Sequence, residues 1–322
     1  MKRIAVLTSG GDAPGMNATI RAVVRTACYE GVEIFGVTRG YKGLIGGDLT
    51  QMNARSVDNI TQRGGTILYS ARCQEFLEPR GRAQAAETLH AYGIEGLVVI
   101  GGNGSFQGAH LLAKEQGVKV IGVPGTIDND IYGTDVTIGF HTAMNIALSA
   151  IDRLRDTGHS HDRLFLVEVM GRHSGHIALN VGIAGGAEEI LVPEREYDIE
   201  AMVTSIAAGR KRGRSSSIIV VAEGAAKGGA MAIEKRIEAA SGYEVRTSVL
   251  GHVQRGGAPS TRDRVLAARL GYHAVIALLE GRTDVMVGVD KRDTVFIPLK
   301  DTWEKQKELE WHLYDINKIL AG

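Results

Sequence analysis

Short runs of apolar residues recur along the chain, with longer mixed segments between them. The runs are rich in Val and Ile and are nearly continuous instead of alternating with polar residues. They are Ile4–Leu7, Val32–Val37, Leu97–Ile100, Val118–Val123, Leu164–Val169, Glu189–Val192 and Ile218–Ala222. Continuous apolar runs of this kind are typical of parallel strands that helices cover on both faces. We therefore predict a β-strand at each of them.

The segments between these runs have the length and the apolar periodicity of helices. They are Ala18–Cys28, Ala83–Tyr92, Gly108–Gln116, Thr142–Arg155 and Ala201–Lys211. Asn17 is the predicted N-cap of the first helix, because Asn side chains accept hydrogen bonds from first-turn N–H groups. Strands and helices that alternate in this way predict an α/β fold. Since the strands are too many for one comfortable sheet, we expect two doubly wound, mainly parallel sheets with helices on both faces.

The end of the chain has a different pattern. Residues Trp303–Leu320 are charged and have the periodicity of a helix. A segment of this kind packs one apolar stripe on a domain and exposes its polar face. We predict an amphipathic surface helix there, packed on the second domain.

Composition and charge narrow the class of protein. A chain of 322 residues suggests two domains of ordinary size. A hydrophobic content of 44% with 23% charged residues is typical of globular proteins. The formal net charge is zero and no block of Lys or Arg occurs, so we expect no nucleic-acid partner. No apolar run approaches the ~18 residues of a membrane span, so we expect no membrane partner either.

The N-terminal residues and the cysteines bear on the compartment. MKRIAVLTSGG turns from a short apolar run into a Gly-rich loop, so we predict a first strand and not a targeting segment. Cys28 and Cys73 give no disulfide framework, which fits a reducing compartment. We therefore expect a cytoplasmic protein.

Glycine is the compositional outlier, with 42 of 322 residues against the ~7% of average proteins. Three Gly-rich loops follow apolar runs: Thr8–Asn17, Gly101–Ser105 and Pro124–Asp130. The first two are typical of phosphate cradles, although neither has the P-loop or dinucleotide-binding spacing. Each loop alone is equally explained by a tight turn without a ligand. Parallel strands bring all such loops to one edge of a sheet, and this favours a binding site.

The third loop reads PGTIDND and carries two close carboxylates, Asp128 and Asp130. One of two neighbouring acids can take a proton from a hydroxyl while the other holds a cation. The alternative is an Asx-type turn, in which these side chains only cap their own backbone. The neighbouring Gly-rich loops favour the catalytic interpretation.

Further polar residues stand at strand ends and in Gly-rich turns of the second half. They are Arg172, Glu223, His252 and Arg255. Arg and His in such places suit a phosphorylated sugar, and Glu suits its hydroxyl groups. For each residue alone, a surface salt bridge or a capped turn is the favoured explanation. The position of all four beside glycines, and not on helix faces, favours binding.

Short segments in a fixed order carry a family resemblance: TSGGDAPGMN, RGGT, SARC, GGxGS, PGTIDND, MGR, VAEG and GHVQRGG. With them the chain resembles the bacterial ATP-dependent 6-phosphofructokinases from about residue 1 to about residue 290. The resemblance implies phosphoryl transfer from MgATP to the 1-hydroxyl of fructose 6-phosphate, with Mg²⁺ as the cofactor. It also implies a cytoplasmic homotetramer of glycolysis, with ADP or phosphoenolpyruvate as allosteric effectors.

The resemblance assigns roles to four residues of the third loop and the MGR segment. Asp128 would accept the hydroxyl proton, and Asp130 would lie beside Mg²⁺ and the sugar. Thr126 would contact the transferred phosphoryl group, and Arg172 would stabilise its developing charge. These roles suit phosphoryl transfer, which depends on positioning and charge stabilisation more than on covalent chemistry.

The resemblance also implies three binding sites and a domain division. The ATP site would contain Gly11, Tyr41, Arg72, Cys73, Gly102, Asn103, Gly104, Ser105 and Gly108. The sugar-phosphate site would contain Thr126, Asp128, Asp130, Met170, Gly171, Arg172, Glu223, His252 and Arg255, with Arg163 and Arg246 from a neighbouring subunit. The effector site would contain Arg21, Arg25, Arg155, Glu188, Arg212 and Arg214, with helix-surface charge as the alternative. Residues 1–139 with 252–302 would bind ATP, and residues 140–251 with 303–322 would bind the sugar phosphate.

The chain departs from the family pattern at Asn103, where the family has the magnesium-associated Asp of GGDGS. Asn keeps the size of Asp but loses the charge that Mg²⁺ prefers. Three explanations stay open: an engineered inactivating change, a paralogue with a reduced or regulatory role, or an active enzyme in which Asp130 suffices. His176 and Asn59 also stand where relatives often carry Asp.

Two glycines indicate the phosphoryl donor. Pyrophosphate-dependent relatives typically carry Asp at the position of Gly104 and Lys at the position of Gly125. Gly at both positions leaves room for the α-phosphate of ATP, so ATP is the predicted donor. A pyrophosphate-dependent enzyme and a catalytically weak regulatory paralogue are the alternatives.

Overall fold

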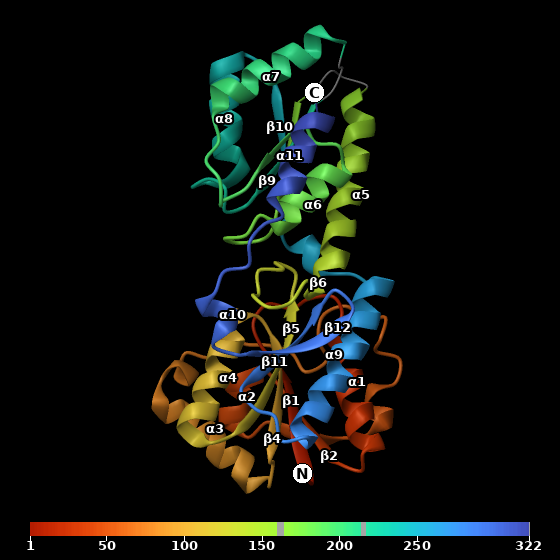
Figure 1. Cartoon of the computed structure of the whole chain (residues 1–322), viewed down its shortest axis with the longest axis vertical. Helices are drawn as coiled ribbons and strands as arrows, with labels where there is room; N and C mark the ends of the chain where they lie inside the picture. Colours follow the sequence, from red (N-terminus) through yellow and green to blue (C-terminus); the bar gives the residue numbers. More distant parts are fainter. Residues whose placement is uncertain (160–163, 214–216, 322) are drawn as a thin grey trace. The chain divides into compact units, whose positions relative to one another are not determined.

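The computed structural model describes residues 1–159, 164–213 and 217–321 and divides into two compact units (Figure 1). Unit 1 consists of Met1–Ile127, Ile131–Thr142 and Arg255–Lys307, and unit 2 of Asp128–Asp130, Ala143–Gln254 and Glu308–Gly322. Each unit contains a mainly parallel sheet with helices packed on it. The predicted α/β fold class is confirmed.

The described part of unit 1 contains a sheet with the strand order β12-β11-β5-β4-β1-β2-β3, and β6 pairs with the end of β5. The strands are β1 (Arg3–Thr8), β2 (Glu33–Val37), β3 (Leu49–Met52), β4 (Gly96–Gly101), β5 (Lys119–Thr126), β6 (Ile138–Gly139), β11 (Val285–Asp290) and β12 (Asp293–Pro298). The inner pairs are parallel, and the β2–β3 and β11–β12 pairs at the two edges are antiparallel. Every residue of β4 is buried, as expected for a central strand covered on both faces.

Helices cover both faces of this sheet (Figure 1). On one face α1 (Met16–Tyr29) and α9 (Thr261–Leu279) pack against each other. The helices on the other face are α2 (Gly40–Gly46), α3 (Pro79–Ala91), α4 (Asn103–Gln116) and α10 (Asp301–Glu304). Leu97, Val99 and Phe106 are fully buried in the apolar cluster beneath these helices, so burial of apolar surface holds this layer in place.

Unit 2 has a parallel sheet with the order β10-β7-β9-β8 in its described residues. Its strands are β7 (Leu164–Val169), β8 (Glu189–Leu191), β9 (Ser217–Ala222) and β10 (Val245–Val249). Its helices are α5 (Phe140–His159, which begins in unit 1), α6 (His176–Ala184), α7 (Ile199–Lys211), α8 (Gly229–Ser241) and α11 (Trp311–Leu320). Leu166, Ile219 and Ile233 lie in the core between α7, α8 and the sheet. In the strand order of this sheet, β7 has a parallel neighbour on either side, β10 and β9.

All the predicted strands are present, and the predicted helices coincide with α1, α3, α4, α5 and α7. The apolar pattern misses the two-residue strand β6 as well as β3, β10, β11 and β12. β3 and β12 are partly exposed edge strands, β10 has the polar sequence VRTSV, and Gly288 interrupts β11. Such strands lack the continuous apolar run on which the prediction depends. Within the described residues, no helix combines the length and the apolar character that crossing a bilayer requires.

The predicted N-cap role of Asn17 is wrong. Gly15, with φ +115°, precedes α1, and Asn17 lies inside the first turn. The Asn17 side chain instead donates to the carbonyls of Arg63 and Gly64 at 3.1 and 3.0 Å and accepts the N–H of Ile67 at 2.7 Å. Asn17 therefore fastens the RGGT segment to α1, a role that local sequence does not reveal.

The single helix predicted for Trp303–Leu320 is also wrong. The segment contains two helices, α10 and α11, with extended backbone after Lys305. The second helix packs on unit 2, where Asn317 Nδ2 donates to the carbonyl of Ala187 at 3.2 Å. The expected packing therefore holds for α11 alone, because α10 belongs to unit 1.

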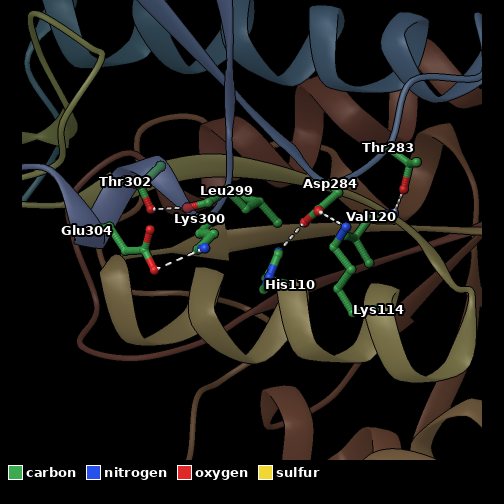
Figure 2. A network of polar contacts seen from close by, with 9 residues as sticks. All are labelled: His110, Lys114, Val120, Thr283, Asp284, Leu299, Lys300, Thr302 and Glu304. Carbon is green, nitrogen blue, oxygen red and sulfur yellow. Dashed lines mark hydrogen bonds and ion pairs between the residues drawn. The ribbon is translucent and has the colours of Figure 1, made fainter.

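A polar network anchors the second half of α4 within unit 1 (Figure 2). His110 Nδ1 lies 2.8 Å from Asp284 Oδ1, and Lys114 Nζ lies 3.9 Å from Asp284 Oδ2. The N–H of Asp284, a residue with φ +58°, donates to the carbonyl of Val120 at 2.9 Å. The helix that begins at the GGNGS loop is thus tied to the connection between α9 and β11.

Candidate active site

The first and second Gly-rich loops meet at the carboxyl edge of the unit 1 sheet, because β1 and β4 are neighbours. The N–H of Ser9 donates to the carbonyl of Ile100 at 2.9 Å. At Gly101 an added Cβ would lie 2.6 Å from Ser105 Oγ and 2.7 Å from the carbonyl oxygen of Ser9. Only glycine therefore fits where these two loops touch.

The GGNGS loop forms the N-terminus of α4, which begins at Asn103. First-turn N–H groups of a helix attract anionic oxygens. An added Cβ at Gly104 would meet no atom within 4 Å, so the space beside this residue is open. At Gly102 an added Cβ would lie 3.8 Å from Thr126 Cβ, and the carbonyl of Thr126 accepts Thr137 Oγ1 at 2.7 Å. Unit 1 thus places the predicted phosphoryl contact, Thr126, beside the second loop.

A stacked aromatic pair borders the start of α4. The rings of Tyr41 and Phe76 have centroids 3.8 Å apart, and Tyr41 Oη donates to the carbonyl of Ser105 at 2.5 Å. Burial raises the pKa of Tyr41 far above its ordinary value, so the hydroxyl remains a donor. An added Cβ at Gly108 would lie 3.0 Å from the Phe76 ring and 3.2 Å from the Tyr41 ring. Phe76 therefore packs against two residues of the predicted ATP site, Tyr41 and Gly108. Sequence reasoning missed Phe76, and the only signal for it was its position shortly after the SARC segment.

The SARC segment supplies two further predicted residues. Cys73 is half-buried against the apolar cluster that contains Tyr41 and Phe76. Arg72 is exposed. Arg72 is therefore the side chain of this segment that is available to an anion, while Cys73 packs.

Gly11 and Arg255 lie against each other in unit 1. An added Cβ at Gly11 would lie 2.4 Å from Arg255 Nη1, and this nitrogen donates to the carbonyl of Asp12 at 3.0 Å. Arg255 is only 7% exposed. A side chain at Gly11 would thus collide with the buried guanidinium of Arg255. The family resemblance assigns Gly11 to the ATP site and Arg255 to the sugar-phosphate site.

In unit 2, the third loop lies beside the MGR segment. Asp128 is buried, and its Oδ2 lies 3.9 Å from Arg172 Nε. The carbonyl of Asp128 accepts Ser174 Oγ at 3.4 Å. Asn129 has φ +54°, and Asp130 is half-buried. The arrangement places a carboxylate that could take a proton beside a cation that could stabilise negative charge.

Glu223 and the backbone of the MGR segment are in contact. Glu223 Oε1 accepts the N–H of Arg172 at 2.7 Å and that of Gly171 at 3.3 Å. Met170 is buried, and His252 is exposed on the short 3₁₀ helix η3 (Gly251–Arg255). Glu223 therefore shapes the turn after β7, a role in addition to the predicted one.

The residues predicted to act across a subunit boundary are described in part. Arg246 lies on β10 with a side chain that is 54% exposed and forms an ion pair with Glu244. Arg163 lies outside the described residues. Exposure leaves the Arg246 guanidinium accessible to another molecule.

The predicted effector residues are not all brought together by direct contacts. Arg25 on α1 pairs with Asp58 at 2.6 Å, and Arg21 precedes it by one turn. In unit 2, Arg155 donates to the carbonyls of Gly185 and Gly186. Glu188 Oε2 accepts the N–H of Ile218, Arg212 follows α7, and Arg214 lies outside the described residues.

A resident metal centre is not evident among the described residues, where no three His, Cys, Asp or Glu side chains gather around one point. Mg²⁺ that arrives with nucleotide phosphates needs only one or two carboxylates from the protein. The half-buried carboxylate of Asp130 is of that kind, and Asn103 offers a neutral oxygen at the start of α4. Each of these residues, considered within its own unit, has an oxygen of the kind that can bind a metal delivered with a nucleotide.

Known proteins of one family are similar to this chain over most or all of its length. The Phosphofructokinase family matches residues 3–278. An ATP-dependent 6-phosphofructokinase of Thermus thermophilus is 56% identical over 321 residues, and one of Shouchella clausii is 51% identical, with full coverage of both chains in each case.

Solved structures share the fold. A phosphofructokinase from Saccharomyces cerevisiae has a TM-score of 0.89 at 36% identity, covering 100% of this chain and 48% of that longer chain. A pyrophosphate-dependent phosphofructokinase from Marinobacter aquaeolei has a TM-score of 0.85 at 26% identity, covering 97% of this chain and 86% of the other. The chain therefore belongs to the phosphofructokinase family.

Proposed function

We propose that this chain transfers a phosphoryl group from MgATP to the 1-hydroxyl of D-fructose 6-phosphate, giving fructose 1,6-bisphosphate in glycolysis. The observation that carries the proposal is the pair formed by Asp128 and Arg172, with 3.9 Å between Oδ2 and Nε. Full-length relatives at 51–56% identity bear the name of this activity. The chain also keeps the loops that suit phosphate binding.

Each residue of the pair has a defined task in this reaction. Asp128, which is buried, takes the proton of the attacking hydroxyl, because a carboxylate can act as a general base once a substrate hydroxyl comes within hydrogen-bonding distance. Arg172 stabilises negative charge on the phosphoryl group as it moves. Thr126, at the end of β5, is the residue that the family resemblance assigns to contact with the transferred phosphoryl group. Catalysis then rests on positioning and electrostatics.

Mg²⁺ bound together with ATP would neutralise negative charge on the phosphates. Asp130 would hold it by a carboxylate oxygen, and Asn103 by an amide oxygen. The first turn of α4 would bind phosphate oxygens through its N–H groups. The charge that Asn103 lacks makes slow turnover the expected behaviour.

ATP is the proposed donor because Gly104 of the second loop and Gly125 of the third loop stand where pyrophosphate-dependent relatives typically carry Asp and Lys. Gly104 has open space beside it, which leaves room for a third phosphate. At Gly125 an added Cβ would lie 3.0 Å from Ile100 Cγ2 and 3.3 Å from Met16 Cε, so a lysine fits poorly there. Pyrophosphate dependence is the alternative within the class, and a regulatory subunit with weak catalysis is the alternative outside it.

The wider assignments complete the proposal. Unit 1 binds ATP, and unit 2 binds the sugar phosphate through Met170, Gly171, Glu223 and His252. Arg255, although it lies in unit 1, serves the sugar phosphate. The enzyme is a cytoplasmic homotetramer in which Arg163 and Arg246 act on a neighbouring subunit's substrate. ADP or phosphoenolpyruvate binds near the effector residues, and no nucleic acid or membrane takes part.

A coupled assay of the purified chain tests the proposal. It contains fructose 6-phosphate, Mg²⁺ and either ATP or pyrophosphate, with fructose as the control acceptor. Turnover with ATP alone is the expected result. Turnover with pyrophosphate alone would assign the other donor, and binding of both ligands without turnover would assign a regulatory subunit.

A further inference from the structure

The turn that follows β7 has a conformation that ordinary residues avoid. Gly171 has φ +143° and Arg172 has φ +52°. The N–H of Ser174 donates to the carbonyl of Gly171 at 2.9 Å and closes the turn. Gly224 approaches so closely that an added Cβ would lie 2.0 Å from the carbonyl oxygen of Arg172. Left-handed backbone at a non-glycine residue persists only where its surroundings hold it.

The strands on either side of β7 supply the contacts that hold this turn. From the β9 side, Glu223 Oε1 accepts the N–H groups of Gly171 and Arg172. From the β10 side, Gln254 Oε1 accepts the N–H of Met170 at 2.8 Å. Three successive N–H groups are therefore bound by two side chains that follow the neighbouring strands.

Packing alone does not explain why a glutamine is buried at position 254. The residue is 0% exposed, and its Nε2 has no hydrogen-bond partner among the described residues. A buried amide with an unsatisfied donor lowers stability, and Met or Leu would fill the same volume without that cost. The bond to Met170 is what the amide provides and an apolar side chain cannot.

We propose that Gln254 is a positioning residue that fixes the left-handed turn presenting Arg172 to Asp128. The side chain of Arg172 is 64% exposed, so packing does little to orient it. Its direction depends on the backbone, which Gln254 and Glu223 hold from the two sides. The kinetic part of this inference rests on the proposed function, while the effect on the turn does not.

The first test is hydrogen exchange in a peptide that spans residues 169–175. Gln254→Met removes the acceptor and keeps the volume, so the N–H of Met170 should exchange at least ~10-fold faster than in the parent. Gln254→Glu keeps an acceptor oxygen and should restore slow exchange. Gln84→Met, an exposed position on α3, is the matched control.

The second test is steady-state kinetics of the same variants. Gln254→Met should lower kcat by about 10- to 100-fold, since a small misplacement of a catalytic group has effects of this size. The KM for fructose 6-phosphate should stay within about threefold, because Arg172 acts mainly on the transition state. Gln254→Glu should recover part of kcat, and Gln84→Met should match the parent.

A double-mutant cycle separates positioning from general damage. If Gln254 acts through Arg172, Gln254→Met should have little further effect on kcat in an Arg172→Ala background. A structural role would lower kcat by the same factor in both backgrounds, and that additivity would overturn the inference. A higher KM with unchanged kcat would overturn it too, by making Gln254 a binding residue.

The exchange test decides the effect on the turn even if the parent shows no phosphoryl transfer. In that case the proposed function fails, and faster exchange at Met170 in Gln254→Met still supports the hold on the turn. Unchanged exchange in a folded Gln254→Met variant would overturn the inference whatever the activity.

Discussion

At the scale of single residues, two of the seven described non-glycine residues with positive φ lie in the loops that carry the candidate chemistry. Asn129 and Arg172 both have positive φ, at +54° and +52°, and each lies within two residues of a group with a proposed role. Residues other than glycine seldom adopt this conformation, although Asn does so more readily than most. Positive φ also occurs away from these loops, for example at Arg39 and Lys291, so it supports the motifs only where contacts such as those around Arg172 hold the turn.

The first prediction concerns the proposed base. Asp128→Asn removes the proton acceptor and keeps the size of the side chain, so kcat should fall by at least ~10²-fold. Binding of fructose 6-phosphate, measured by calorimetry, should change much less. Asp152→Asn, on an exposed part of α5, is the control. A variant at 128 within a few-fold of the parent rate would remove Asp128 from this role.

The second prediction concerns the neutral residue in the second loop. Asn103→Asp introduces a negative charge at the proposed phosphate and Mg²⁺ site, so turnover should rise by up to ~10²-fold and half-saturation by Mg²⁺ should occur at a lower concentration. The melting temperature should hardly change, since the two side chains are similar in size. Asn53→Asp, an exposed N-cap, controls for added charge. Equal turnover and equal magnesium dependence would make Asn103 a tolerated substitution.

At the scale of elements, an ion pair ties α3 to α4 and holds the segment next to the aromatic pair. Arg82 donates to Glu115 at 2.6 and 2.7 Å and to the carbonyls of Phe76 and Leu77 at 2.9 and 2.7 Å. The Arg82 side chain is 4% exposed, so the pair is partly withdrawn from solvent. Phe76 is thereby fixed against Tyr41 and the start of α4.

The third prediction is a pH dependence of stability from this pair. The hydrogen bond from Arg82 lowers the pKa of Glu115 below its ordinary 4.5. A lowered pKa stabilises the folded state above pH 4.5, and this contribution is lost as the pH falls through the folded-state value. Glu115→Gln should lower the free energy of unfolding at pH 7 by about 1 kcal/mol. Urea titrations at pH 7 and in acid, with exposed Glu87→Gln as control, should show that the difference shrinks in acid; a constant difference would contradict the mechanism.

At the scale of the whole molecule, we propose that another copy of the chain completes the active site. Arg246 is exposed on the edge strand β10 and pairs only with nearby Glu244 among the contacts described for it. A closed homo-oligomer places the same edge of each subunit in an equivalent contact. Arg246 can then serve a neighbour's substrate without any change in its own chain.

The fourth prediction follows from this sharing. Asp128→Asn and Arg246→Ala should each be nearly inactive alone, because each removes one half of the composite site. Mixed tetramers made by refolding the two variants together should regain activity in roughly a quarter of their sites. Light scattering should give a tetramer for all three preparations. A fully active monomer, or mixed tetramers without recovery, would contradict the shared site.

The sequence alone determined the fold class, the position of most strands and the family. Apolar runs such as Val118–Val123 have a local cause, since a strand buried on both faces must be apolar throughout. Gly-rich segments after such runs likewise indicate where the backbone turns sharply. The order of the motifs indicated the family. These features are readable because the residues that cause them are neighbours in the chain.

Only the tertiary structure decided which distant residues meet. Neither the pairing of Gly11 with Arg255 nor that of Gln254 with Met170 has a local signature, and Asn17 resembled an ordinary cap until its bonds to the RGGT segment were visible. Strand order determines such contacts, because it brings the ends of β9 and β10 to both sides of β7. Order depends on how whole elements pack, and packing energy is shared among residues far apart in the sequence.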